Sequence, residues 1–188
     1  VGTFQSNSVK WVWHDGIGYY FPNGGKINVQ SGEQSGSWFN INANRSKEEV
    51  KGKVFKLWFN HDLDPVDQTY SYIVKPGVSE REMMNSNLSM INIIANDVGM
   101  QAVAHSDLQM VQVVFHKAGS LIRSGYTITV DQPCILLMKD VDTKSPIISV
   151  SDPTQKLTDI RISLNGVSTS LTFPQGAHRG ATVSFRFK

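Results

Sequence analysis

The chain has 188 residues, of which 18% are charged, and a formal net charge of +2. This length accommodates one large or two small domains with a hydrophobic core, and the charged fraction is below the roughly 25% of an average globular chain. Lys and Arg are spread along the sequence, which argues against binding to nucleic acid or to a membrane surface. No apolar stretch approaches the ~18 residues of a membrane-spanning helix.

The first predicted element is a β-hairpin within KWVWHDGIGYYFPNGG, residues 10–25. Asp15-Gly16 is a two-residue turn signal because both residues adopt positive φ at low cost. Pairing the strands around this turn places Trp13 opposite Gly18, Val12 opposite Tyr19 and Trp11 opposite Tyr20. Both faces are then apolar, so both must be covered, or one aromatic patch is left exposed. Trp13 opposite Gly18 suggests an indole ring lying over the glycine.

The next segments predict a second hairpin. A loop rich in Gly, Ser and Asn carries Trp38 and leads to a strand at Val54–Asp62. The turn DLDPVDQ then leads to TYSYIVKPG, in which Tyr70 and Tyr72 share one side. We expect these two strands to pair with each other.

A short helix follows, because Ser79 and Glu82 have the spacing of a capping box. The hydrophobic pattern changes near residues 86–92, which predicts a domain boundary. We expect a sheet layer buried on both sides in residues 1–90 and a lighter antiparallel β-sandwich in residues 91–188. In the second part, Asn165-Gly166 predicts a hairpin turn, and Val183, Phe185 and Phe187 alternate as the inner residues of the last strand.

The residue types that most often bind metals or carry out catalysis form no recognisable motif in this sequence. The histidines at 14, 61, 105, 116 and 178 lack metal-site spacing, and Asp62, Asp64 and Asp67 fit a turn better than a calcium loop. We therefore predict no metal and no cofactor. Cys134 lies in the apolar run PCILLM, which predicts a buried, inert thiol.

Aromatic residues are the remaining candidates for binding. Sugars stack the C–H faces of their rings on Trp and Tyr, so Trp11, Trp13 or Trp38 would suit a polysaccharide if exposed. The alternative is that the rings pack in the core, which the doubly apolar hairpin favours.

Six phrases occur in an order and at a spacing that resemble one enzyme family. They are WVWHDGIGYYFP, VQSGEQSGSWFNIN, KGKVFKLWFNHD, TYSYIVKPG, LQMVQVVFHKAG and DQPCILLMKD. Together they resemble the C-terminal portion of polysaccharide lyase family 8, with the chondroitin AC lyases nearest and the hyaluronate and xanthan lyases more distant. The resemblance covers nearly the whole chain and is weakest after about residue 140.

The resemblance implies an all-β chain, in which residues 1–90 are the last part of an antiparallel β supersandwich and residues 91–188 a small antiparallel β-sandwich. It also implies a parent enzyme that cleaves uronic-acid-containing glycosaminoglycans by β-elimination and carries an N-terminal helical toroid. In that family the Asn, Tyr, His and Arg of the reaction lie on the toroid, and a supporting Glu lies early in the supersandwich. No catalytic residue is therefore expected in this chain.

Two functions are open at this stage, besides a scaffold domain with no sugar role. One is a non-catalytic region of such a lyase, whose partners would be the toroid and a glycosaminoglycan. The other is an autonomous carbohydrate-binding module that uses Trp11, Trp13 or Trp38. The resemblance implies a bacterial protein that is secreted or periplasmic.

Overall fold

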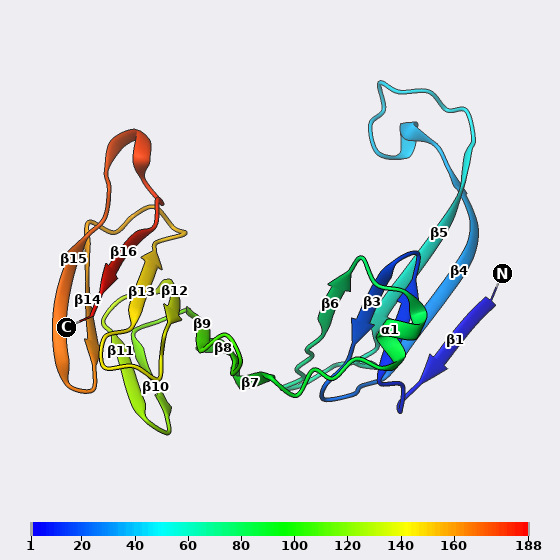
Figure 1. Cartoon of the computed structure of the whole chain (residues 1–188). Helices are drawn as coiled ribbons and strands as arrows, with labels where there is room; N and C mark the ends of the chain where they lie inside the picture. The colour runs from blue at the N-terminus through cyan, green and yellow to red at the C-terminus, as the bar shows by residue number, and fades with distance from the viewer. Residues whose placement is uncertain (1, 188) are drawn as a thin grey trace. The chain divides into compact units, whose positions relative to one another are not determined.

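The computed structural model describes residues 2–187, and most of its regular structure is β-strand. The predicted all-β, antiparallel fold class is confirmed. The chain divides into two compact units between Ser86 and Asn87, here called unit 1 and unit 2 (Figure 1). Among the described residues, no helix is long and apolar enough to cross a bilayer.

Unit 1 contains two three-stranded sheets, with the strand orders β1-β4-β5 and β2-β3-β6. Their bounds are β1 (Gly2–Ser6), β2 (Trp11–His14), β3 (Ile17–Tyr20), β4 (Ile27–Gly36), β5 (Val50–Phe59) and β6 (Ile73–Pro76). β4 and β5 continue past the end of β1 as a two-stranded arm (Figure 1). A 3-10 turn at Trp38–Asn40 lies in the loop that ends the arm.

The Asp15-Gly16 hairpin is confirmed with the predicted register. β2 and β3 pair Trp11 with Tyr20, Val12 with Tyr19 and Trp13 with Gly18. The two turn residues have φ values of 47° and 77°, as a tight hairpin turn between twisted strands requires. The turn chemistry of two residues therefore sets which aromatic side chains share a face.

Helix α1 (Glu80–Met84) covers one face of this hairpin. The predicted capping box is confirmed, since the Ser79 amide donates to Glu82 Oε2 at 2.8 Å and the Glu82 amide donates to Ser79 Oγ at 3.2 Å. The Ser79 hydrogen bonds lower the pKa of the Glu82 carboxyl. The cap fixes the start of a helix that is otherwise too short to be stable alone.

The prediction that an indole ring covers Gly18 is wrong. The Met83 side chain of α1 fills that space, with its Cγ 3.2 Å from the position that a Cβ on residue 18 would take. Trp13 instead donates its indole N–H to the Val78 carbonyl at 2.7 Å. A flexible thioether fills this narrow gap more easily than a rigid bicyclic ring does.

The predicted pairing of the Val54–Asp62 strand with TYSYIVKPG is also wrong. β5 pairs with β4, and β6 pairs with β3, so the two strands belong to different sheets. The connection between them contains three aspartates with left-handed backbone: Asp62, Asp64 and Asp67, with φ of 59°, 51° and 51°. These residues turn the chain away from β5 and carry it to the second sheet, so Tyr70 and Tyr72 lie on a loop just before β6.

Unit 2 contains a six-stranded sheet, in the order β16-β13-β12-β9-β8-β7, and a four-stranded sheet, in the order β10-β11-β14-β15. The strands are β7 (Ile91–Asn96), β8 (Met100–His105), β9 (Met110–Phe115), β10 (Gly119–Arg123), β11 (Tyr126–Val130), β12 (Cys134–Lys139), β13 (Ile147–Ser151), β14 (Asp159–Leu164), β15 (Val167–Thr172) and β16 (Val183–Arg186). Both sheets contribute alternate residues to one apolar core, which is the pattern of a β-sandwich.

The Asn165-Gly166 hairpin is confirmed, with β14 and β15 paired from Leu164–Val167 outward. Val167 itself is 56% exposed, so the buried side of the hairpin does not extend to the turn. The predicted burial of Cys134 is confirmed, because the residue is 1% exposed in the sandwich core. Burial raises the pKa of the Cys134 thiol to about 12 and so suppresses the reactive thiolate.

Asp152 organises the loop between β13 and β14 from a buried position. It is 1% exposed, and its carboxylate accepts hydrogen bonds from the amides of Thr154, Lys156 and Leu157 and from the Thr154 hydroxyl, at 2.6–2.8 Å. Burial alone would raise the pKa of Asp152, but these four hydrogen bonds lower it to about 2. The carboxylate therefore replaces the backbone partners that the loop amides lack.

We predict that Asp152→Asn lowers the free energy of unfolding of unit 2 at pH 7 by about 1–3 kcal/mol, because the loop amides lose an anionic acceptor. A lowered folded-state pKa contributes stability above the unfolded-state value of about 3.9 and loses it as the pH falls toward 2. Urea unfolding, followed by the NMR amide signals of unit 2, measures the free energy of unfolding at each pH. As the pH falls, this free energy should decrease more steeply in the native chain than in the variant. Asp107→Asn, at an exposed turn position, serves as the control. Equal acid profiles for the native chain and Asp152→Asn would contradict this role.

Candidate functional site

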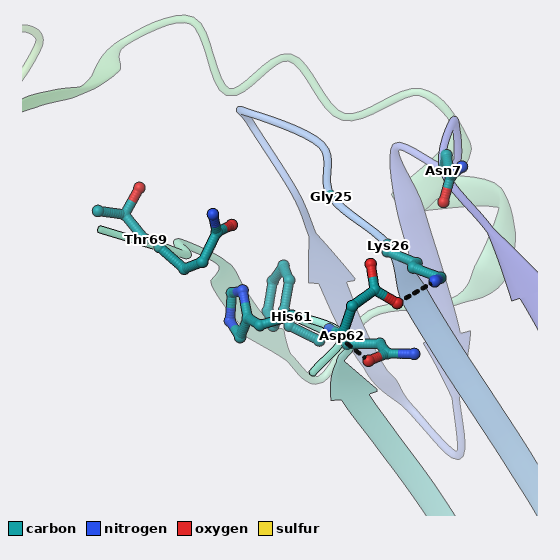
Figure 2. A pocket seen from close by; sticks show the side chains of 9 residues that line it. Asn7, Gly25, Lys26, His61, Asp62 and Thr69 are labelled. Atoms are coloured by element: carbon teal, nitrogen blue, oxygen red, sulfur yellow. Dashed lines mark hydrogen bonds and ion pairs between the residues drawn. The ribbon is translucent and has the colours of Figure 1, made fainter. Parts of the chain in front are cut away.

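Unit 1 carries two adjoining hollows that share Phe59 and His61. The first has a volume of ≈ 480 Å³ and is here called the polar hollow; it is lined by Asn7, Gly25, Lys26, Phe59, Asn60, His61, Asp62, Gln68 and Thr69 (Figure 2). The second has a volume of ≈ 440 Å³ and is here called the aromatic hollow; it is lined by Tyr19, Phe55, Leu57, Phe59, His61, Tyr70 and Tyr72. Polar groups and ring faces therefore lie on one continuous surface.

An ion pair crosses the polar hollow. Lys26, just before β4, places its Nζ 2.5 Å from Oδ1 of Asp62, and Figure 2 shows the two side chains turned toward each other. The Asp62 amide donates to Oδ1 of Asn60 at 2.9 Å, which supports the left-handed backbone at residue 62. The charges of Lys26 and Asp62 largely cancel, so the hollow offers hydrogen-bonding groups without a strong net field.

Phe59 forms the wall between the two hollows. It is the last residue of β5, and its ring meets the buried Phe21 edge to face, with 5.6 Å between centroids. Gly25 allows this ring to sit close to the backbone, because a Cβ at residue 25 would lie 3.1 Å from Phe59 Cδ1. Gly25 also has φ of 134°, a conformation that glycine alone adopts easily.

The aromatic hollow exposes two nearly parallel rings. Tyr70 and Tyr72 have an interplanar angle of 12° and centroids 6.4 Å apart, and they are 58% and 51% exposed. Phe59 lies 5.2 Å from Tyr70 and stacks with His61 at 6.5 Å. The rings therefore pack against one another, and more than half of each tyrosine stays exposed.

The tryptophans proposed as sugar platforms lie at three other places. Trp11 and Trp13 are half-buried in β2, and Trp13 is held by its hydrogen bond to Val78. Trp38 is 59% exposed in the loop at the end of the β4–β5 arm. None of the three lines either hollow. Their role in binding stays a prediction.

Reasoning from the sequence missed the residues that line the hollows. The alternation in TYSY placed Tyr70 and Tyr72 on one side, and the neighbouring FNHD contained Asn60, His61 and Asp62. The pattern of both segments is also that of a hairpin and its turn, so the sequence alone did not point to a site. Lys26 had no local signal, because its partner Asp62 is 36 residues away in the chain.

No group of three or more His, Cys, Asp or Glu side chains that could hold a metal ion occurs among residues 2–187. In the polar hollow, His61 and Asp62 are accompanied by amides, a hydroxyl and a lysine. A lysine ammonium paired to the carboxylate repels a cation rather than coordinating one. The donor set suits hydroxyl groups of a ligand better than a metal.

Comparison with known families and proteins accounts for both units. Residues 2–87 match the model of the polysaccharide lyase family 8 super-sandwich domain, and residues 92–161 match that of the family 8 C-terminal beta-sandwich domain. The chain belongs to polysaccharide lyase family 8. The resemblance inferred from the sequence phrases is thereby confirmed.

Similar family 8 proteins are much longer than this chain. Chondroitinase-AC from Pedobacter heparinus is 39% identical over 193 residues, a match that covers 99% of this chain and 27% of that protein. A hyaluronate lyase from Thermasporomyces composti is 30% identical, with 84% of this chain and 20% of that protein covered. The chain therefore spans about a quarter or less of the length of these relatives.

Solved family 8 structures have the same fold. A chondroitinase AC lyase determined in enzyme–oligosaccharide complexes is 39% identical and has a TM-score of 0.85, over 98% of this chain and 28% of that one. A Paenibacillus xanthan lyase is 23% identical with a TM-score of 0.75, over 92% of this chain and 19% of that one, and shows likeness of fold.

We predict that Gly25→Ala lowers the free energy of unfolding of unit 1 by about 1–3 kcal/mol, because residue 25 is strained and Phe59 must shift. Gly36→Ala is the matched control, since a Cβ at that position meets nothing within 4 Å and no positive φ is involved. Urea unfolding followed by tryptophan fluorescence reports on unit 1, which contains all four tryptophans. Equal unfolding midpoints for the two variants would refute the close packing of Phe59 on Gly25.

Proposed function

We propose that this chain is the non-catalytic β region of a larger polysaccharide lyase, whose parent cleaves a uronic-acid-containing glycosaminoglycan by β-elimination. The family membership of both units supports this proposal, as does the identity to chondroitinase-AC over 27% of that protein. The parent would supply the remaining domains, including a helical toroid that carries the reacting groups.

The charge balance of the polar hollow is the observation that carries the proposal. β-Elimination next to a carboxylate needs a base for the C5 proton and positive or hydrogen-bonding groups at the carboxylate. Residues of suitable types do gather here. The ring centroids of His61 and Tyr70 are 6.0 Å apart, and Lys26 lines the same hollow as His61. However, Lys26 is paired with Asp62 at 2.5 Å, and that carboxylate would repel a uronate. This pairing argues against a role of the hollow in stabilising an enolate-like intermediate.

A structural role in the parent fits the edge of the first sheet. β1 pairs with β4 on one side and is an edge strand of the described sheet β1-β4-β5. Its Phe4 is 53% exposed, and an unpaired edge next to an apolar side chain is a natural place for another strand. In the parent, this region would extend the super-sandwich and support the wall of the substrate cleft beside the toroid. Because a polysaccharide does not cross a bilayer, we assign the parent to the secreted or periplasmic space.

A second candidate function is an autonomous carbohydrate-binding module that uses Trp11, Trp13 or Trp38. The 59% exposure of Trp38 favours it, because an open indole face is available for stacking. Trp11 and Trp13 are half-buried and offer less of their ring faces. The loop at the end of the β4–β5 arm is therefore the part of this candidate that merits a test.

We predict that the 188-residue chain does not cleave chondroitin sulfate, chondroitin or hyaluronan. The ultraviolet absorbance of the unsaturated uronide product should stay at the level of a sample without protein, while an active chondroitinase in parallel gives a rising signal. His61→Ala should leave this baseline unchanged. Turnover by the native chain that disappears in His61→Ala would contradict the proposal and would make the polar hollow an active site.

A further inference from the structure

We propose that the free edge of β5 and the aromatic hollow beside it are the docking site of one further β-strand, supplied by a part of the parent lyase outside these 188 residues. The strand would join the sheet β1-β4-β5 next to β5 and place apolar side chains in the hollow. The inference rests on the proposed function, because it takes the parent to be a longer protein, and it names the partner of this surface.

The interior of unit 1 is much less complete than that of unit 2. Among the described residues, nineteen buried apolar side chains form the sandwich core of unit 2, whereas unit 1 contributes four: Phe21, Ile27, Val78 and Met83. The two units are nevertheless of similar length. Because packed sheets bury their facing sides, two sheets with so few buried residues are only partly covered on their inner faces.

The partly covered side chains gather at the aromatic hollow. Phe55, Leu57 and Phe59 alternate along β5, so they share the face of the sheet that lines the hollow. All three are partly exposed, and Tyr72 in the same wall is 51% exposed. The hollow of ≈ 440 Å³ therefore has room for further apolar side chains, which would remove the apolar surface of its walls from water.

The backbone of β5 is open at its outer edge. β5 is the last strand in the order β1-β4-β5 and pairs with β4 alone among the described strands. The Asn60 amide donates to the Lys26 carbonyl at 2.9 Å, so the backbone of residue 60 faces the side of β4. Because successive residues of an antiparallel strand direct their backbone groups to opposite sides, Phe55, Leu57 and Phe59 direct theirs to the free edge.

One added strand would satisfy both features. Neighbouring strands lie about 4.8 Å apart, and directly opposite residues of an antiparallel pair place their side chains on the same face. Residues opposite Phe55, Leu57 and Phe59 would therefore form backbone hydrogen bonds with β5 and direct their side chains into the hollow. In strand addition of this kind, the backbone bonds provide affinity, and the pocket for alternate side chains provides specificity.

The charges on β5 argue against a second copy of the same strand as the partner. Lys51, Lys53 and Lys56 are exposed along β5. Among the described residues, Lys51 lies 4.0 Å from Glu33 and 3.9 Å from Glu49, whereas Lys53 and Lys56 form no ion pair. Two copies of β5 side by side would add to each other's positive charge, and lysines on an edge strand oppose self-association. A strand with Asp or Glu opposite these lysines fits better.

The rest of the parent is the source of such a strand. The match to chondroitinase-AC covers 27% of that protein, so most of that relative lies outside the matched region. Residues 2–87 match a super-sandwich domain, a fold that is built from packed sheets. A strand in the same protein chain has a high effective concentration, so an interface of one strand and a few side chains is sufficient.

The test is amide hydrogen exchange at single-residue resolution in the 188-residue chain and in the full-length parent. In the 188-residue chain, the amides of Phe55, Leu57 and Phe59 should exchange at least about tenfold faster than those of Lys56 and Trp58, which face β4. In the parent, all five should exchange at similar, slow rates. Slow exchange of the three edge amides in the 188-residue chain, or fast exchange of them in the parent, would overturn the inference.

A pair of variants of the parent tests the part played by the hollow. Leu57→Ala should raise the exchange rates of the Phe55 and Phe59 amides about tenfold or more, because the docked strand loses an apolar contact. Lys56→Ala, whose side chain lies on the other face of the sheet, should change these rates by less than about twofold. Equal effects of the two variants would contradict docking through the hollow.

The oligomeric state identifies the occupant. Sedimentation of the 188-residue chain should show a monomer, because the positive charge of β5 opposes pairing with itself. A dimer in which the edge amides of β5 are protected would show that a second copy occupies the edge and would overturn the inference.

The lyase assay is independent of these outcomes. Product formation by the 188-residue chain would overturn the non-catalytic assignment and leave strand docking intact. Fast exchange at the edge of β5 in a parent that cleaves a glycosaminoglycan would overturn strand docking and leave the proposed function intact.

Discussion

Packing around Phe59 is the interaction on which the surface of unit 1 depends. The ring stands at the last position of β5, between the buried Phe21 at 5.6 Å and the exposed Tyr70 at 5.2 Å. It can occupy that position because Gly25 has no side chain to displace it. One residue thus connects the core to a loop that carries most of the polar and aromatic groups of the candidate site. We therefore expect a change in the core at this point to shift the rings of the candidate site.

The Lys26–Asp62 ion pair gives the same surface its chemical character. Its net charge is close to zero, although its groups are individually polar, and this combination suits hydroxyl-rich ligands. The ion pair also bears on whether these residues could be catalytic, which their types alone do not decide. His61, Tyr70 and Asn60 are types that a lyase could employ, but the carboxylate beside them opposes the stabilisation of a uronate-derived anion. The Lys26–Asp62 pairing therefore argues against this constellation as a catalytic site.

Local chemistry made parts of the fold predictable. Asp15-Gly16 and Asn165-Gly166 determine the registers of their hairpins, because a two-residue turn with positive φ allows only one pairing of the flanking strands. The Ser79–Glu82 capping box marks the start of α1. The partners of β5 and β6 could not be predicted in this way. Sequence proximity favoured a hairpin, whereas long-range packing placed the strands in different sheets. The candidate site depends on that same packing, since the residues of FNHD and TYSY meet Lys26 only in the folded unit.

The most direct test of the account is one NMR experiment on the ¹⁵N-labelled 188-residue chain with chondroitin tetrasaccharide, followed over time. The account predicts that the sugar signals stay constant over time. The appearance of an olefinic proton signal from an unsaturated uronide would contradict the proposal that this family 8 region is non-catalytic.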